Sequence, residues 1–259
     1  MGTVCAFLMA CGGTDQEAIT PPRAAPQIDF DTYRGGQMAE LVTDDAGNTT
    51  TYPDAFGVTV YNLTDGSRVM KFRDKEYNLG VGAITDDWNV TDGNESIFLT
   101  IEDRKHPLLG SDAIEFFRLK KQTPTETIVG LMIRGPITPL DDTPTPLVAD
   151  YVGVVDFIDA NALEYSGSFS MSADFTNKST NGRVSGFNPG KPNQSLSFSD
   201  TYKFLGFLAD PRSTDVPDIS GRVLGRFYGD NAQVTGGTVR VDSVAENLAV
   251  IGVFTADQQ

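Results

Sequence analysis

The 259-residue sequence has very few of the side chains that most metal sites and nucleophilic active sites use. It contains two cysteines, one histidine and one tryptophan. A zinc site built from a cysteine cluster is therefore excluded, and Ser–His or Cys–His catalysis has few candidate members. The sequence also lacks a Gly-x-Ser-x-Gly elbow, a phosphate-binding loop and a His-Glu-x-x-His motif. Paired carboxylates are abundant but no pair stands out, so we expect a protein that is not an enzyme.

Positive charge is also scarce. The chain has 20 Lys and Arg against 35 Asp and Glu, for a net charge of −15. This balance argues against binding nucleic acid or anionic lipid through charge. It fits either a basic partner or cationic ligand, or solubility at a negatively charged cell surface. We favour the second interpretation.

Long apolar runs are absent, and the one near the N-terminus is too short to span a bilayer, which takes about 20 residues. It ends in Leu8-Met-Ala10-Cys11, which resembles a bacterial lipoprotein signal cleaved before Cys11. Unlike most such signals, it has no Lys or Arg before the apolar run. We expect residues 1–10 to be the signal peptide, Cys11 to carry acyl chains, and the polar, Pro-rich residues 11–27 to be a tether. Cys11 is then the only cysteine of the mature chain, which excludes an internal disulfide.

Helical periodicity is absent as well, which leaves short alternating segments separated by turns. The 26 glycines and 14 prolines interrupt these segments, as is typical of a mainly β protein. Residues 28–140 predict a first set of strands, at 56–61, 67–72, 79–84, 96–101, 113–119 and 127–133. Four prolines in residues 136–146 predict a domain boundary, with a linker at 141–147.

Residues 148–259 predict eight further strands. In the clearest one, Phe169, Met171, Ala173 and Phe175 alternate with serines and Asp174, so one face is apolar and the other is polar. Eight strands can close into a barrel that its own side chains just fill, and closure removes exposed edges. The interior should therefore be core and not a pocket. The predicted strand starts lie near Val148, Leu163, Gly182, Ser195, Thr201, Ile219, Thr235 and Asn247.

The glycine-interrupted motifs of this second part resemble one known family. They run in the order Gly225, Phe227-Tyr228-Gly229, Asn231-Ala232, Gly236-Gly237-Thr238 and Gly252-Val253-Phe254, after a Tyr151-x-Gly153 entry. This order is similar to the barrel domain of transferrin-binding-protein-like surface lipoproteins. The resemblance covers roughly residues 150–259 and gives Gly225, Phe227, Tyr228, Gly229, Gly236 and Gly237 a structural role.

The resemblance implies an all-β fold, with an N-terminal β handle domain (28–140) before an eight-stranded antiparallel barrel (148–259). It implies a protein anchored by lipid in the outer membrane, periplasmic or surface-exposed. Such a protein holds a protein or metal-bearing ligand near a TonB-type receptor and is displayed with help from a dedicated exporter. Family members that capture transferrin have two lobes and this chain has one, so transferrin itself does not follow.

Two residues are candidate ligand contacts. Trp88, in a polar loop predicted at 86–95, is either an exposed anchor for a partner or a side chain folded onto the handle core. His106 is the only histidine and could ligate haem iron, although a surface role is the more common one for such a residue. The acidic segments at 44–48 and 86–95 do not fit a calcium loop, and we predict hairpin tips. No cofactor is expected, and haem is the open exception.

Three other functions compete with the lipoprotein interpretation. A haem-binding, hemophore-like carrier would use His106. A non-catalytic envelope adhesin would need no small ligand. A carbohydrate-active enzyme would need a buried carboxylate pair at glycosidase spacing.

Overall fold

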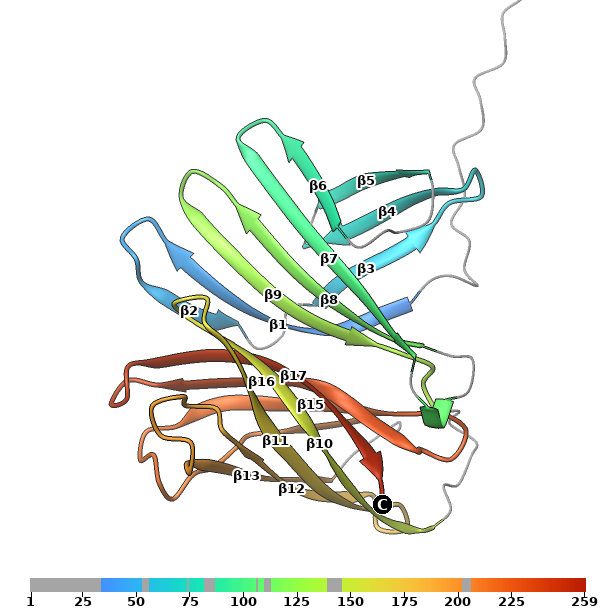
Figure 1. Ribbon diagram of the computed structural model, residues 1–259, viewed down its shortest axis with the longest axis vertical. Coiled ribbons are helices and arrows are strands. Elements are labelled where there is room, and N and C mark those ends of the chain that lie inside the picture. Colours follow the sequence, from blue (N-terminus) through green and yellow to red (C-terminus); the bar gives the residue numbers. More distant parts are fainter. Residues whose placement is uncertain are drawn as a thin grey trace, which may run out of the picture.

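The protein folds into two antiparallel sheets stacked on each other (Figure 1). The structure, a computed structural model, describes residues 34–52, 56–73, 75–81, 87–105, 107–109, 113–138, 146–201 and 206–259. Nine strands between Arg34 and Arg134 form the first sheet, and eight between Val148 and Gln258 form the second. The predicted all-β class, with a barrel following another β unit, is confirmed. Within the described ranges, no helix combines the length and apolar character that crossing a bilayer requires.

The first sheet, called the handle sheet here, has the strand order β5-β4-β3-β1-β9-β8-β7-β6, with β2 pairing β1. Its strands are β1 (Arg34–Asp44), β2 (Thr49–Tyr52), β3 (Phe56–Asn62), β4 (Ser67–Phe72), β5 (Lys75–Val81), β6 (Asp87–Asp92), β7 (Glu95–Lys105), β8 (Ala113–Gln122) and β9 (Glu126–Arg134). A short 3-10 turn, η2 (Pro107–Leu109), lies between β7 and β8.

Three of these strands were missing from the sequence prediction: β1, β2 and β6. The strand predicted at 79–84 is β5, which begins at Lys75. The segment 86–95, predicted as one polar loop, contains the whole of β6 and turns only at Gly93 and Asn94. Polar residues dominate β6, and they can occupy a strand here because β6 is the last strand of the sheet, paired on one side only.

Both faces of the handle sheet are apolar. One face, inside the curl of the sheet, carries the inner cluster: Met38, Val42, Met70, Phe72, Tyr77, Leu79, Ile97, Leu99, Phe117, Leu119, Ile128 and Met132. Because successive strand residues point to opposite faces, the alternate residues of β1, β8 and β9 form the outer cluster. That cluster joins handle and barrel: Ala39, Leu41, Leu109, Ile114, Phe116, Leu131 and Ile133 pack with Ile158, Tyr228, Val234, Ile251 and Val253.

Polar contacts fix the edges of this interface. Thr51 on β2 donates to the Asp242 carboxylate, and Arg240 donates to the Thr51 carbonyl at 3.3 Å. At the other end, Ile137 forms a β-bridge with Tyr228, and Thr138 Oγ1 donates to the Gly229 carbonyl at 2.7 Å. The handle is therefore held to the barrel at both ends of a continuous apolar contact.

The second sheet is a nearly closed barrel with the strand order β13-β12-β11-β10-β17-β16-β15-β14. Its first strand pairs with its last, β10 with β17. Between β13 and β14, backbone hydrogen bonds of 2.8 Å join Ser197 and Arg212 in both directions, and the Leu208 amide donates to Asp200 at 2.9 Å. The strands are β10 (Val148–Asp159), β11 (Glu164–Asp174), β12 (Ser179–Ser185), β13 (Ser195–Thr201), β14 (Gly206–Ala209), β15 (Ser220–Tyr228), β16 (Val234–Ser243) and β17 (Leu248–Gln258).

The predicted strand count and order for the barrel are confirmed. Most strands start within one residue of the predicted position. The strand predicted to start near Gly182 starts three residues earlier, at Ser179. The fifth is wrong: Thr201 is the last residue of β13, and β14 begins at Gly206. The two strands were predicted as separate, but the start of the second was placed five residues too early.

Aromatic side chains fill the barrel. Phe169 stacks on Phe254 with ring centroids 4.0 Å apart, and Phe198 stacks on Phe207 at 5.9 Å. The Tyr151 hydroxyl donates to the Ala232 carbonyl at 2.6 Å, so its polar group is satisfied inside the apolar core. The prediction that the interior is core is confirmed. The buried cluster also includes Val155, Phe157, Met171, Phe175, Val184, Phe187, Leu196, Val223, Phe227, Val239 and Val250.

Glycines make room for these rings and for the close approach of strands. Gly225 and Gly237 face each other across β15 and β16. A Cβ on Gly225 would lie 2.2 Å from the Phe207 ring, and one on Gly237 would lie 1.9 Å from the Leu224 carbonyl oxygen. Gly229, after β15, has φ of +80°, a conformation that favours glycine. Gly236 lies on the outer face, where a Cβ would be 2.8 Å from Ile133 of the handle.

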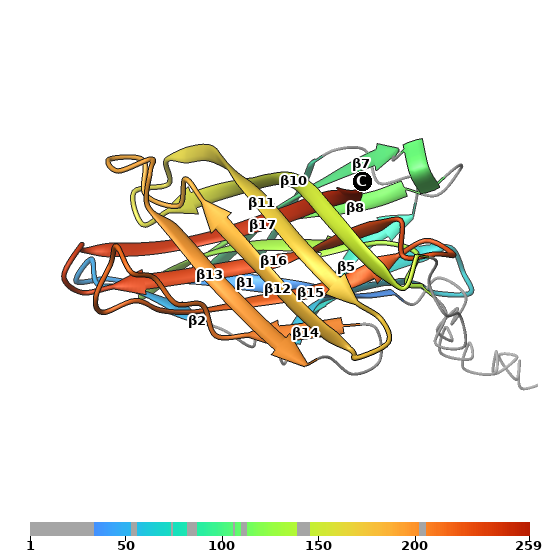
Figure 2. The ribbon, with the colours of Figure 1, turned by 90° about the horizontal axis from the view of Figure 1, so that it is seen from below.

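Strands β11, β12 and β13 form the barrel wall farthest from the handle (Figure 2), and most of their outward side chains carry hydroxyl groups. On β11, β12 and β13 every second residue points outward, and the pairing places Ser170 beside Arg183 and Arg183 beside Ser197. The charged residues of these rows are Arg183 of β12 and Glu164 and Asp174 at the two ends of β11. We call this surface the serine wall; its other members are Ser166, Ser168, Ser172, Ser179, Asn181, Ser185, Ser195, Ser199 and Thr201.

We predict that Gly225→Ala destabilises the barrel by about 1–3 kcal/mol, because the added methyl group must displace the buried Phe207 ring. Gly190→Ala is the control, since its Cβ would meet only Asn188 Oδ1, at 3.4 Å. The measurement is urea unfolding followed by tyrosine and tryptophan fluorescence. Equal stability of the two variants would contradict the proposed role of Gly225.

Candidate functional site

A cleft lies where the outer face of the handle sheet meets the β10–β11 hairpin of the barrel. It has a volume of about 460 Å³. Side chains of the outer cluster line its apolar part: Phe116, Leu131, Ile158 and Val253. Each of the four is less than 9% exposed, so they form a floor and not a surface patch.

Charged groups flank this apolar floor. Arg118 of β8 forms an ion pair with Glu164, at the start of β11, and so links the two sides of the cleft. On the barrel side, Asp156 accepts a hydrogen bond of 2.9 Å from the Ser166 hydroxyl. The handle wall of the cleft is thus basic and the barrel wall is acidic.

A second hollow, of about 570 Å³, continues from the cleft across β8, β7 and β6. It shares Thr100 and Arg118 with the cleft, so the two form one depression, called the trough here. The second hollow also contains Phe98, 40% exposed, and Lys120, which is exposed. Neutral polar side chains complete its lining: Asn89, Thr91, Ser96 and Gln122.

The trough combines features that typical protein-binding surfaces have. Large apolar and aromatic groups form its centre, and polar groups and an arginine surround them. The described lining contains no histidine or cysteine, and no group of three or more potential metal ligands occurs anywhere in the described residues.

Neither of the two ligand contacts named from sequence is part of the described lining of the trough. The backbone of Trp88 lies in β6, opposite Leu99, and not in a loop. Its neighbour Asn89 lines the trough. The side chain of Trp88 lies outside the described residues, as do His106 and Cys11.

Sequence reasoning missed Phe98, Arg118 and Lys120. A signal was present for Phe98, which alternates with the buried Ile97 and Leu99 and so had to lie on the other face of its strand. The cleft itself depends on the meeting of β8 and β11, which are far apart in the sequence.

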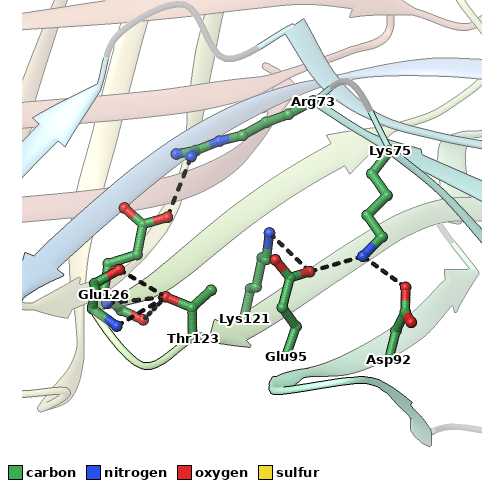
Figure 3. A network of polar contacts seen from close by, with 8 residues as sticks. Arg73, Lys75, Asp92, Glu95, Lys121, Thr123 and Glu126 are labelled. Carbon is green, nitrogen blue, oxygen red and sulfur yellow. Dashed lines mark hydrogen bonds and ion pairs between the residues drawn. The ribbon is translucent and has the colours of Figure 1, made fainter.

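A network of ion pairs closes the handle sheet beneath the trough (Figure 3). Lys75 of β5 binds Asp92 at 2.6 Å and Glu95 at 3.1 Å, which connects the two terminal strands of the sheet through their side chains. Lys121 binds the same Glu95 at 3.4 Å. Because Lys120 and Lys121 are adjacent in β8, one faces the trough and the other faces this network.

A second ion pair reaches deeper into the handle. Arg73 binds Glu40 at 2.9 Å and Glu126 at 3.7 Å. Glu40 is 1% exposed, so its carboxylate depends on Arg73 for charge compensation. The hydrogen bonds from Lys75 lower the pKa values of Asp92 and Glu95, and the same bonds raise the pKa of Lys75. This arrangement stiffens the sheet that carries the trough.

The barrel part of the chain matches the model of a known protein family. Residues 143–258 match a family model described as the C-lobe and N-lobe beta barrels of Tf-binding protein B. Residues 143–258 form a transferrin-binding protein B (TbpB)-type β-barrel domain. The resemblance inferred from the glycine motifs is confirmed over this part of the chain. A comparison with curated proteins finds no match.

Solved structures of TbpB are similar to the chain at low identity. A variant from Haemophilus parasuis Hp5 has 19% identity and a TM-score of 0.45, with 86% of this chain and 45% of that chain covered. TbpB from serogroup B Neisseria meningitidis has 17% identity and a TM-score of 0.44, with 86% and 43% covered. A variant from Actinobacillus pleuropneumoniae H49 has 11% identity and a TM-score of 0.44, with 86% and 100% covered. The chain thus spans less than half the length of the first two.

We predict that Lys75→Met destabilises the handle at neutral pH and not in acid. A carboxylate whose pKa is lower in the folded than in the unfolded state stabilises the fold at pH values above its unfolded pKa. This stabilisation is lost as the pH falls through the folded pKa. The ordinary values are 3.8 for Asp92 and 4.5 for Glu95. The contribution of protonated Lys75 to stability is fully present below pH 10.5, which is the ordinary pKa of this group. The difference in Tm between wild type and variant should therefore be constant near neutral pH, begin to shrink as the pH falls through the ordinary values of 4.5 and 3.8, and vanish below the lowered pKa values of the folded state.

Lys120→Met is the matched control for this experiment. Lys120 is an exposed lysine of the same sheet that forms no ion pair with a described side chain. Its replacement should leave Tm nearly unchanged at every pH. A Lys75→Met difference that does not shrink as the pH falls below 3.8 would show that the ion pairs do not stabilise the handle.

Proposed function

We propose that this chain is a non-catalytic binding lobe that holds a protein partner, or a metal-bearing carrier protein, in the trough. The single observation that supports this is the apolar-floored cleft between handle and barrel. Buried apolar residues with a charged rim are suited to anchoring a side chain of a partner. The TbpB-type barrel supports a binding role. In this proposal residues 28–140 are the handle domain and 148–259 the barrel domain, joined by a linker at 141–147.

We further propose that the lobe is anchored in the outer membrane through acylated Cys11, the first residue of the tether at 11–27. A stable anchor requires two or more acyl chains, because one chain binds only marginally. An anchored lobe would keep a bound partner close to a membrane transporter.

Partner capture tests the binding proposal. The full chain is immobilised and exposed to the fluids in which the bacterium lives, and a retained protein is identified and its Kd measured. Phe98→Ala should weaken that Kd by about tenfold or more, as loss of a central aromatic contact does. Leu208→Ala is the control, because Leu208 is 43% exposed on the barrel strand β14 and Phe98 is 40% exposed. Retention of no defined protein would contradict a binding role.

Membrane fractionation tests the anchor. In the producing bacterium, Cys11→Ser should shift the protein from the membrane fraction to the aqueous fraction, because no acylated cysteine is left. Cys5→Ser should leave it in the membrane, since Cys5 lies in the proposed signal peptide. Immunoblots of the two fractions give the readout. Membrane association of the Cys11→Ser protein would rule out anchoring through this residue.

A further inference from the structure

The part of the trough that lies on β6, β7 and β8 differs in charge from the rest of the protein. Its described lining includes two cations, Arg118 and Lys120, and no carboxylate. The whole chain has a net charge of −15. Because Arg118 is paired with Glu164, Lys120 is the charge here that can attract an acidic group, on a surface that otherwise repels one. Steering of this kind favours a negatively charged partner.

Lys120 is the cation that remains available to a ligand. It is exposed and forms no ion pair with any described side chain. Arg118, in contrast, already pairs with Glu164 across the cleft. The register places Lys120 directly opposite Phe98, so a charged head and an exposed ring are neighbours on one sheet face.

The apolar cleft fixes the second chemical requirement of the ligand. Its floor residue Phe116 lies on the same strand and the same face as Lys120, four positions away. In a strand four residues span about 13 Å, which equals four residues of an extended ligand. An extended segment with an apolar side chain in the cleft can thus place an acidic residue, up to four positions away, at Lys120.

We propose that the trough binds an extended acidic segment of a protein, in which an apolar anchor residue and an Asp or Glu lie within four positions of each other. This inference rests on the proposed binding function and specifies its ligand. An acidic glycan would satisfy Lys120 but has no apolar group for the floor of Phe116, Leu131, Ile158 and Val253. The apolar floor decides between these two ligand classes in favour of the peptide.

Selection from a library of random 12-residue peptides displayed on phage tests this proposal. The immobilised full chain should enrich sequences in which Leu, Ile or Phe lies within four positions of Asp or Glu. The same selection is made with Lys120→Glu, with Phe98→Ala and with the control Arg183→Glu. Arg183 is an exposed arginine in the middle of a strand on the serine wall, so its charge reversal matches that of Lys120 without touching the trough.

The best enriched peptide is then synthesised and its Kd measured by fluorescence anisotropy. We expect Lys120→Glu and Phe98→Ala each to raise this Kd by about tenfold or more, and Arg183→Glu to leave it unchanged. Circular dichroism and Tm confirm that every variant folds. Added salt should weaken the wild-type interaction, because the Lys120 contact is exposed to solvent.

Three results would overturn the proposal: no enrichment, enrichment of neutral or basic peptides, or equal binding by Lys120→Glu. A heparin fragment is the probe for the glycan alternative; binding of heparin that depends on Lys120, without peptide enrichment, would also overturn it. If the capture experiment yields a partner that Phe98→Ala weakens while the peptide selection fails, the binding function stands and the ligand class is wrong. If no partner is captured, the proposed function itself fails.

Discussion

The packing of one sheet on both of its faces is the constraint on which the rest of the molecule depends. Strands β1 and β9 bury alternate residues in the inner cluster of the handle and in the outer cluster against the barrel. Met132 and Ile133, adjacent in β9, are each at most 1% exposed although they face opposite sides. The inner face stabilises the handle and the outer face joins it to the barrel. The cleft exists because β8 extends beyond this contact and leaves part of its outer face uncovered.

The barrel provides the rigid partner for that contact. Its interior is filled by stacked rings, and glycines stand where a side chain would collide with a ring or with the backbone of the next strand. Outward residues of the same strands, such as Tyr228 and Ile251, belong to the interface with the handle. A substitution inside the barrel that shifts these strands would therefore also shift the interface residues beside the trough. The walls of the trough are fixed relative to each other before a partner arrives, which reduces the entropy lost on binding.

The barrel could be predicted from sequence much better than the handle. Its inward residues alternate cleanly with serines and charged residues, as in β11, and its glycines mark the positions where rings pack. In the handle, strands buried on both faces do not alternate, and β9 contains the run Ile128 to Ile133. The polar edge strand β6 has the composition of a loop and becomes a strand only by pairing with β7. Trp88 was accordingly placed in a loop. The trough could not be predicted, because the Arg118–Glu164 contact joins residues 46 positions apart and follows from how two units pack.

The serine wall has a consequence for how such a lobe behaves among other molecules. Its short hydroxyl side chains can hydrogen-bond to water and present little apolar area, and its charged residues are Arg183, Asp174 and Glu164. A protein that contacts this wall gains little binding free energy by displacing water from it, so such contacts are short-lived. Two copies of the chain that meet through their serine walls would bury little apolar area, so this side of the barrel disfavours self-association.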